Sequence, residues 1–168
     1  GANGRHEWFW EPGDENNIYS LNELMDKYEK SVGRNATLIL GLTPDTTGLL
    51  PAGDAKRLQE MGQEINRRFS APVAKTSGQK TVLTLNTKKD QEINYYMIQE
   101  NIKKGERIRR YTIEAKVKGK WLVVSEGESV GHKRIEKIKS ISANAFRLTI
   151  NQSTSIPDIV NFSVFNVE

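Results

Sequence analysis

Apolar positions follow two different periods along the chain, and the change falls near residue 70. In residues 20–32 they recur at helical spacing, at Leu21, Leu24, Met25, Tyr28 and Val32. Ser20 and Glu23 have the spacing of a capping box at the start of this helix. Residues 51–69 repeat the pattern with Ala55, Leu58, Gly62, Ile65 and Phe69. Each segment is therefore predicted to be a helix with one apolar face.

Between these helices, residues 37–42 are apolar at nearly every position. Such a run is typical of a strand in a parallel sheet that is covered on both faces. The turn-forming residues 43–48 follow it. One strand with two helices cannot close a sheet, so residues 1–69 are expected to be an incomplete part of a larger α/β unit.

From residue 70 onward the apolar positions alternate with period two, without a helical pattern. The boundary is placed at Ser70-Ala71-Pro72. Short runs separated by Gly, Asn, Ser or Pro predict an antiparallel β-sandwich. The predicted strands are residues 81–85, 93–99, 107–118, 121–125, 133–139, 146–150 and 160–167.

Composition excludes several functions. The chain has 168 residues and no cysteine, which rules out disulfides and thiol catalysis, and its two histidines cannot form a multi-histidine metal site. We expect neither a metal nor another cofactor. No apolar run is long enough to span a membrane. Residues 101–140 contain 12 Lys/Arg against 5 Asp/Glu, but their alternation predicts a solvated sheet face, and no nucleic-acid partner is expected.

Three segments of the first half carry a resemblance to a known family. They are Trp8-Phe9-Trp10, Leu21-Asn22-Glu23-Leu24, and residues 31–51 from Ser31-Val32-Gly33-Arg34-Asn35 to Leu49-Leu50-Pro51. In order and spacing they resemble the α-L-fucosidases of glycoside hydrolase family 29. The family has Pro-Pro-Asp where this chain has Thr43-Pro44-Asp45.

The second half resembles the discoidin-like β-sandwich that follows the barrel in many such enzymes. The matching residues are Gln99-Glu100, Gly105-Glu106-Arg107-Ile108, Ile113-Glu114-Ala115, Lys120-Trp121, Gly127, Gly131-His132-Lys133-Arg134-Ile135, Phe146-Arg147-Leu148-Thr149-Ile150 and Ile156-Pro157. The two resemblances occur in the order that the family shows.

The resemblance implies an α+β fold with two domains. Residues 1–69 would be the last helix–strand–helix of a (β/α)₈ barrel, with residues 43–50 on its active-site face. Residues 70–168 would be an antiparallel β-sandwich of the galactose-binding, discoidin-like jelly-roll type.

The implied activity is hydrolysis of α-linked L-fucose from glycans by a retaining mechanism, in which an Asp nucleophile and a Glu acid/base act as a pair. Both are expected upstream of this chain, so its own catalytic residues are unknown and the chain alone is expected to be inactive. The expected partners are fucosylated glycans through the complete enzyme, and the incomplete barrel is expected to self-associate. A bacterial enzyme of this family would be periplasmic or secreted.

Three residues near the N-terminus are candidates for substrate binding. Trp8 and Trp10 could stack on a sugar or form part of the core, and His6 could bond a hydroxyl or be an ordinary loop residue. The carboxylates of Glu7, Glu11, Asp14 and Glu15 could include the acid or border the site, but solvated loop carboxylates are the favoured interpretation. We expect Asp45 to cap its turn.

The sandwich offers fewer candidates. Trp121 is expected in the core. Gly131-His132-Lys133-Arg134 invites a phosphate or sugar interpretation, but the resemblance favours a structural role at the start of a strand. The alternative function for the chain is a carbohydrate-binding module, a glycan-binding sandwich without catalysis.

Overall fold

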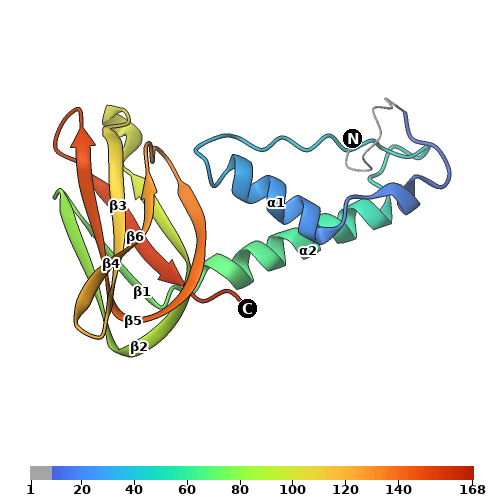
Figure 1. Cartoon of the computed structure of the whole chain (residues 1–168). Coiled ribbons are helices and arrows are strands. Elements are labelled where there is room, and N and C mark those ends of the chain that lie inside the picture. Colours follow the sequence, from blue (N-terminus) through green and yellow to red (C-terminus); the bar gives the residue numbers. More distant parts are fainter. Residues whose placement is uncertain (1–8) are drawn as a thin grey trace.

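A computed structural model describes residues 9–168 (Figure 1). Two helices precede six strands, and short 3₁₀ turns flank them. The elements are η1 (Asp14–Asn17), α1 (Leu21–Ser31), α2 (Ala52–Phe69), β1 (Ala74–Gly78), β2 (Val82–Glu100), η2 (Ile102–Lys104), β3 (Ile108–Val117), β4 (Lys120–Gly127), β5 (Arg134–Ser153) and β6 (Ile159–Phe165). A helical segment followed by an antiparallel β-sandwich confirms the predicted fold class.

The strands form one antiparallel sheet in the order β1-β6-β2-β5-β3-β4, and this sheet folds into two layers. Strands β2 and β5 belong to both layers. The second half of β2 pairs with β6 and with the first half of β5, whereas its first half pairs with the second half of β5, which also pairs with β3. Bulges at residues 86–91 and 93–95 of β2 interrupt the pairing between the two halves.

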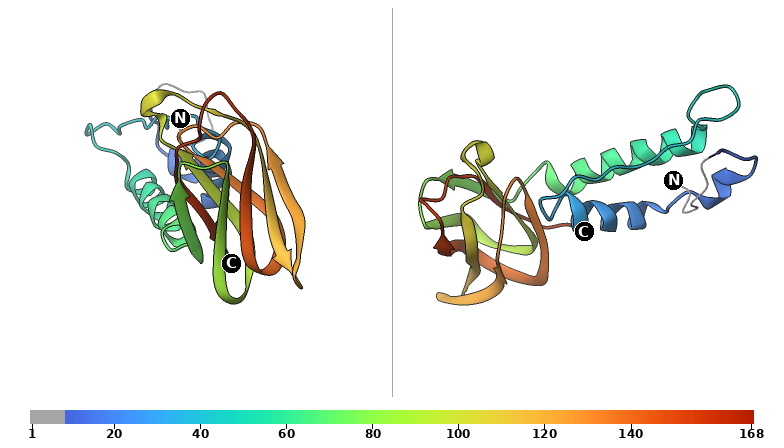
Figure 2. Two further views of the ribbon diagram at one scale, coloured as in Figure 1. Left: turned by 90° about the vertical axis from the view of Figure 1, so that its left-hand side faces the viewer. Right: turned by 90° about the horizontal axis from the view of Figure 1, so that it is seen from above.

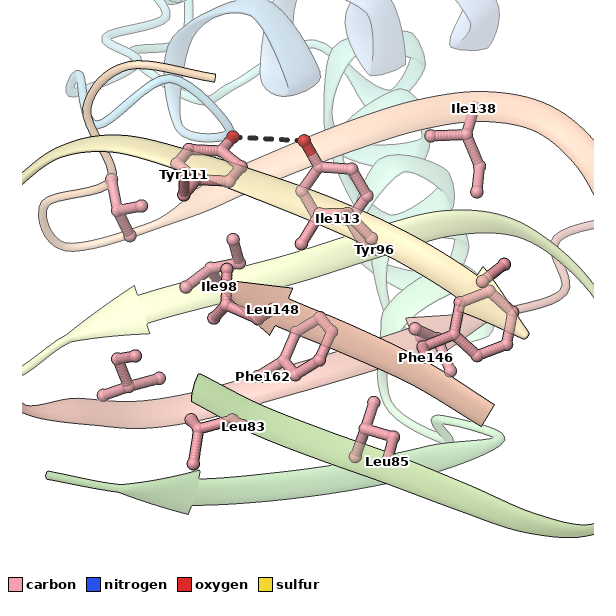
Figure 3. Packing of buried hydrophobic residues seen from close by; sticks show 14 of the residues in the cluster. Leu83, Leu85, Tyr96, Ile98, Tyr111, Ile113, Ile138, Phe146, Leu148 and Phe162 are labelled. Atoms are coloured by element: carbon pink, nitrogen blue, oxygen red, sulfur yellow. Dashed lines mark hydrogen bonds between the residues drawn. The ribbon is translucent and has the colours of Figure 1, made fainter. Parts of the chain in front are cut away.

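Side chains from both layers meet in the core of the sandwich (Figure 3). Ile98 and Phe162 come from one layer, and Ile113, Phe146 and Leu148 from the other; all five are completely buried. The hydroxyls of Tyr96 and Tyr111 lie 3.1 Å apart, and Tyr96 also bonds Ser125 at 2.9 Å. Burial raises the pKa of both tyrosines, so these hydroxyls remain neutral in the core.

The layer that contains β6 is covered on its other face by the helices. Along β2, Tyr96 and Ile98 point into the sandwich, whereas Tyr95 and Met97 join a second buried cluster with Leu24, Met25, Tyr28 and Met61 of the helices. Phe69, at the end of α2, contacts the rings of Tyr28, Tyr95 and Phe165. Burial on both faces fits the run of aromatic and aliphatic side chains at residues 95–98.

Helices α1 and α2 lie side by side, and both run toward the sandwich (Figure 1). The predicted capping box is present: Ser20 Oγ accepts from the Glu23 amide at 3.3 Å, and Glu23 accepts from the Ser20 amide at 2.8 Å. Arg68 joins the helices, since its guanidinium donates to Glu29 and Glu64 at 2.8 and 2.7 Å. Both predicted helices are therefore confirmed.

The strand predicted at residues 37–42 is not formed. The segment runs extended, away from the sandwich and opposite to the helices, without ladder hydrogen bonds (Figure 2). Leu38 and Leu40 pack on the helix cluster, whereas Ile39 between them is 86% exposed. The expected burial on both faces is thus wrong for this chain, because the described residues supply no neighbouring strand.

The predicted sandwich strands overlap the observed ones, several of them running one or two residues beyond an observed end, but two pairs of them are continuous. Residues 81–85 and 93–99 both fall on β2, and residues 133–139 and 146–150 both fall on β5. Strand β1 was not predicted, because its sequence Ala-Lys-Thr-Ser-Gly contains little apolar signal.

The ion pairs of Glu64 with Arg67 and Arg68, all within α2, are sensitive to acid. Hydrogen bonds from Arg67 and Arg68 lower the pKa of Glu64 from 4.5 to about 2. Ionised Glu64 therefore stabilises the fold fully above about pH 4.5, and this contribution is lost as the pH falls toward 2.

We predict that Glu64→Gln lowers the free energy of unfolding at pH 7 by about 1 kcal/mol, a value limited by solvent screening. It should also weaken the pH dependence of stability between pH 4.5 and 2. Urea titrations at pH 7, 4 and 3 measure both effects, with Asp26→Asn, which breaks the exposed pair to Lys30, as the control. An unchanged pH dependence in Glu64→Gln would contradict the assignment.

Candidate functional site

The end of the helical segment away from the sandwich gathers most of the candidate residues. The η1 turn and the loop of residues 43–50 lie there (Figure 2), and Trp10 shortly precedes η1 along the chain. Trp10 is half-buried, whereas its neighbour Phe9 is 83% exposed. His6 and Trp8 lie outside the described residues. The loop follows the extended segment directly, so it occupies the position that follows a strand in an α/β unit.

Asp45 builds this loop, as predicted. Its Oδ1 accepts from the Thr47 amide at 2.8 Å and from the Thr47 hydroxyl at 2.6 Å, and the Leu49 amide lies at 3.4 Å. These bonds, above all that from the Thr47 hydroxyl, lower the pKa of Asp45. The carboxylate is ionised and its Oδ1 is engaged within the loop, which is the role of an Asx turn.

The carboxylates near Trp10 do not share one environment. Glu11 and Glu15 are exposed, in agreement with the favoured interpretation, but Asp14 is buried, with 6% exposure. Asp14 Oδ2 accepts from the Glu11 amide at 3.0 Å, which closes the turn before η1. Burial, and to a smaller extent the charge of Asp14, raises the pKa of Asp54 at the start of α2. Glu7 lies outside the described residues.

A second group of residues joins the helical segment to the sandwich. The residues after α1 pair with the start of β5: the Asn35 amide donates to the Lys133 carbonyl at 3.0 Å, and the Ile135 amide donates to the Gly33 carbonyl at 2.9 Å. Arg34 bonds the Ile135 carbonyl at 3.0 Å and forms an ion pair with Glu136.

Asn35 occupies the centre of this joint. Its backbone is left-handed, with φ 64°, a conformation that Asn tolerates better than most residues. Its side chain accepts from the His132 amide at 2.7 Å and donates to Glu106 at 2.6 Å. A Cβ at Gly131 would lie 2.3 Å from this side chain, so the close approach requires glycine there.

Buried Glu100 holds the other side of the same turn. One carboxylate oxygen accepts from the amides of Arg107 and Ile108, at 2.9 and 3.1 Å, and the other from the Gly131 amide at 2.9 Å. The residues of Gly131-His132-Lys133-Arg134 therefore have the structural role that was predicted. His132 itself is exposed, and its amide is what contacts Asn35.

Trp121 is not in the core, contrary to expectation. It is partly exposed on β4, with Arg147 4.3 Å from the centre of its ring. The strand period explains the error, because Trp121 pairs with Lys116, which points outward from β3. The apolar character of tryptophan suggested burial, but its position in the alternation indicates the outer face.

Neither a metal centre nor a membrane helix is found within the described part of the chain. Residues 9–168 hold no group of three or more His, Asp or Glu side chains that could bind a metal ion. Across the same residues, no helix combines the length and the apolar character needed to cross a membrane.

Comparison with known proteins relates the chain to glycoside hydrolases. No protein-family model matches it. The crystal structure of a candidate α-L-fucosidase from Bacteroides thetaiotaomicron has a TM-score of 0.96 and 71% identity, over 100% of this chain and 39% of that chain. A family 29 glycoside hydrolase from an unknown rumen bacterium has a TM-score of 0.84 and 26% identity, over 96% of this chain and 31% of that chain.

A curated plant protein supports the same assignment. The candidate α-L-fucosidase 1 of Oryza sativa subsp. japonica is 25% identical over an alignment of 196 positions, which covers 96% of this chain and 38% of that protein. The resemblance to the α-L-fucosidases of glycoside hydrolase family 29 is thus confirmed along almost the whole chain. The chain spans less than two-fifths of the length of each of these relatives.

We predict that Asn35→Ala lowers the free energy of unfolding by about 2–3 kcal/mol. Two side-chain hydrogen bonds are lost, and alanine adopts the left-handed backbone conformation less readily than asparagine. Asn35→Gly should lose about 1 kcal/mol less, since glycine accepts this φ. Urea unfolding measures the stability, and faster hydrogen exchange of the Ile135 amide locates the change. Equal stability of wild type and Asn35→Ala would show that the joint contributes little.

Proposed function

We propose that this chain is the C-terminal part of an α-L-fucosidase. The observation that carries the proposal is the similarity to fucosidase relatives along almost the whole chain, combined with coverage of less than two-fifths of each relative. In this proposal residues 1–69 belong to the catalytic barrel, and residues 70–168 form the sandwich that supports it.

The geometry of residues 36–42 supports the barrel assignment. The segment is extended and antiparallel to both helices, with Leu38 and Leu40 packed on the helix cluster and Ile39 exposed on the other side. A strand of a (β/α)₈ barrel has the same two sides, one toward the helices and one toward the barrel interior. Residues 43–50 would then lie at the C-terminal end of a barrel strand, where active sites of this fold are built.

The proposed chemistry needs two carboxyl groups about 5 Å apart, one as nucleophile and one as acid/base. Asp14 and Asp45 instead bind backbone amides of their own turns, and Glu100 binds the amides of Arg107, Ile108 and Gly131. We therefore assign the catalytic pair to the part of the enzyme upstream of this chain. The role assigned to this chain is to supply Trp8, Trp10 and His6 to the wall of the fucose site.

Aromatic rings at this position suit fucose, because its methyl group and C–H faces are apolar while its hydroxyls need polar partners. Fucosylated glycans are accordingly the proposed substrates of the complete enzyme. Since such glycans are external to the cell, we place the enzyme in the periplasm or outside the cell.

The isolated chain should not release 4-nitrophenol from 4-nitrophenyl α-L-fucoside, because it lacks the catalytic pair. The intact protein to which it belongs should do so, and NMR should show that the first sugar product keeps the α configuration. Turnover by the isolated chain at ordinary enzyme rates would refute the assignment of the pair. An intact protein that is inert on the fucoside but cleaves another glycoside would refute the proposed function.

The exposed side of residues 37–42 should make the isolated chain self-associate, because an extended segment without neighbouring strands can pair with another chain. Light scattering across a concentration series should show a mass that rises above the 19.0 kDa of one chain. Ile39→Lys places a charge on this side and should shift the equilibrium toward monomer. A constant monomer mass at high concentration would contradict the expectation.

A further inference from the structure

The outer face of the β-sandwich, on the layer that the helices do not cover, has an organised surface of its own. It consists of β4, β3, the second half of β5 and the first half of β2. In this layer Leu83, Ile113 and Leu148 point into the core. Their neighbours along the strands point outward and form cross-strand rows, one of which contains Thr84, Arg147, Glu114 and Val123.

Trp121 lies on this face, and the side chain of Arg147 packs against its ring. The guanidinium of Arg147 lies 4.3 Å from the centre of the indole ring. That guanidinium is itself fixed by two hydrogen bonds to Glu114, at 2.7 and 2.8 Å. A bidentate pair fixes the guanidinium plane as well as its position. The indole therefore has a rigid support on the protein side, although it belongs to neither buried cluster.

A groove of about 510 Å³ lies on the same face, toward the other end of β3 and β4. Its walls carry polar groups, with Thr112 and Asn151 bonded to each other at 2.9 Å. Gly127 belongs to its lining, and a Cβ there would lie 2.3 Å from the Tyr111 ring. The remaining lining residues are Arg110, Glu126 and Glu128.

The charged side chains that line the groove and those that contact Trp121 or Arg147 balance one another. The groove and the surroundings of Trp121 together contain three basic side chains, Arg110, Lys116 and Arg147, and three acidic ones, Glu114, Glu126 and Glu128. A surface for nucleic acid or another polyanion needs an excess of positive charge. A balanced set of donors and acceptors beside a supported aromatic ring instead suits a neutral ligand with many hydroxyls.

We infer that this face binds a neutral glycan chain, with Trp121 stacked on a sugar ring and the groove bonded to hydroxyls further along the chain. Trp121 and Glu126 are five residues apart on one strand, roughly 16 Å. This separation requires an oligosaccharide or polysaccharide rather than a single sugar. The site goes beyond the proposed function, because it lies on the layer away from the helices and takes no part in hydrolysis.

The inference is tested with the full 168-residue chain by electrophoresis in gels that contain a neutral polysaccharide, either xyloglucan or galactomannan. Wild type should be retarded by at least one of them, and Trp121→Ala should lose at least about tenfold in affinity. Arg147→Lys keeps the charge but loses the bidentate support, and it should lose severalfold. Ile156→Ala, which changes an exposed apolar residue outside the face, should bind as wild type.

Fluorescence shows whether the indole itself touches the ligand. In a variant with Trp8→Phe and Trp10→Phe, Trp121 is the only tryptophan of the chain. Its emission should shift on titration with the polysaccharide that retards wild type in the gel. Circular dichroism verifies that every variant is folded.

The inference is overturned if folded wild type is not retarded by either neutral polysaccharide, or if Trp121→Ala binds as well as wild type. Retardation only by an anionic polysaccharide such as polygalacturonate, lost with added salt, would also overturn it. Hydrolysis of the aryl fucoside by the intact protein carrying Trp121→Ala is a separate readout. It should remain at the wild-type rate, so that failure of the glycan site and failure of the proposed function are distinguishable.

Discussion

The double burial of one sheet layer determines the arrangement of this chain. Strand β2 sends Tyr96 and Ile98 into the sandwich and Tyr95 and Met97 into the helix cluster, so the same four residues anchor two cores. Burying such side chains contributes roughly 1.5–3 kcal/mol each, and neither core keeps its full set of contacts without the other. The helical segment is therefore attached to the sandwich by packing, and the hydrogen bond that the Tyr95 hydroxyl of β2 donates to Glu29 of α1, at 3.3 Å, adds direction to that attachment.

The joint at Asn35 converts this packing into a defined geometry. Hydrogen bonds between residues 33–35 and the start of β5 fix where the extended segment leaves the sandwich. The segment then carries the loop of Asp45 to the far end of the helices. In the proposed enzyme, a domain remote from the chemistry would thus help to set the position of an active-site loop. That is a structural reason for a fucosidase to keep a sandwich even where it makes no contact with substrate.

The sequence predicted the elements that depend on local patterns and missed those that depend on tertiary context. The helices, the capping box at Ser20 and the turn of Asp45 follow from spacing and side-chain chemistry, and the structure contains them. The described residues supply no strand beside residues 37–42, so their apolar run forms no ladder here. Trp121 was misplaced because the apolar character of its side chain was given more weight than its position in the inward–outward alternation of the strand. Asn35 could have been noticed, since Asn adopts the left-handed conformation more readily than most residues, but its contacts with residues about 70 and 97 positions later have no local signal.

The sharing of β2 and β5 by both layers has a mechanical consequence. A sandwich assembled from two separate sheets has a seam along which the sheets can slide or part. Here both long strands cross from one layer to the other, so a shift of register in one layer would have to propagate through the bulges into the second. The domain should accordingly resist pulling and local opening as one body, and it should fold slowly because its longest pairings must close before either layer is complete.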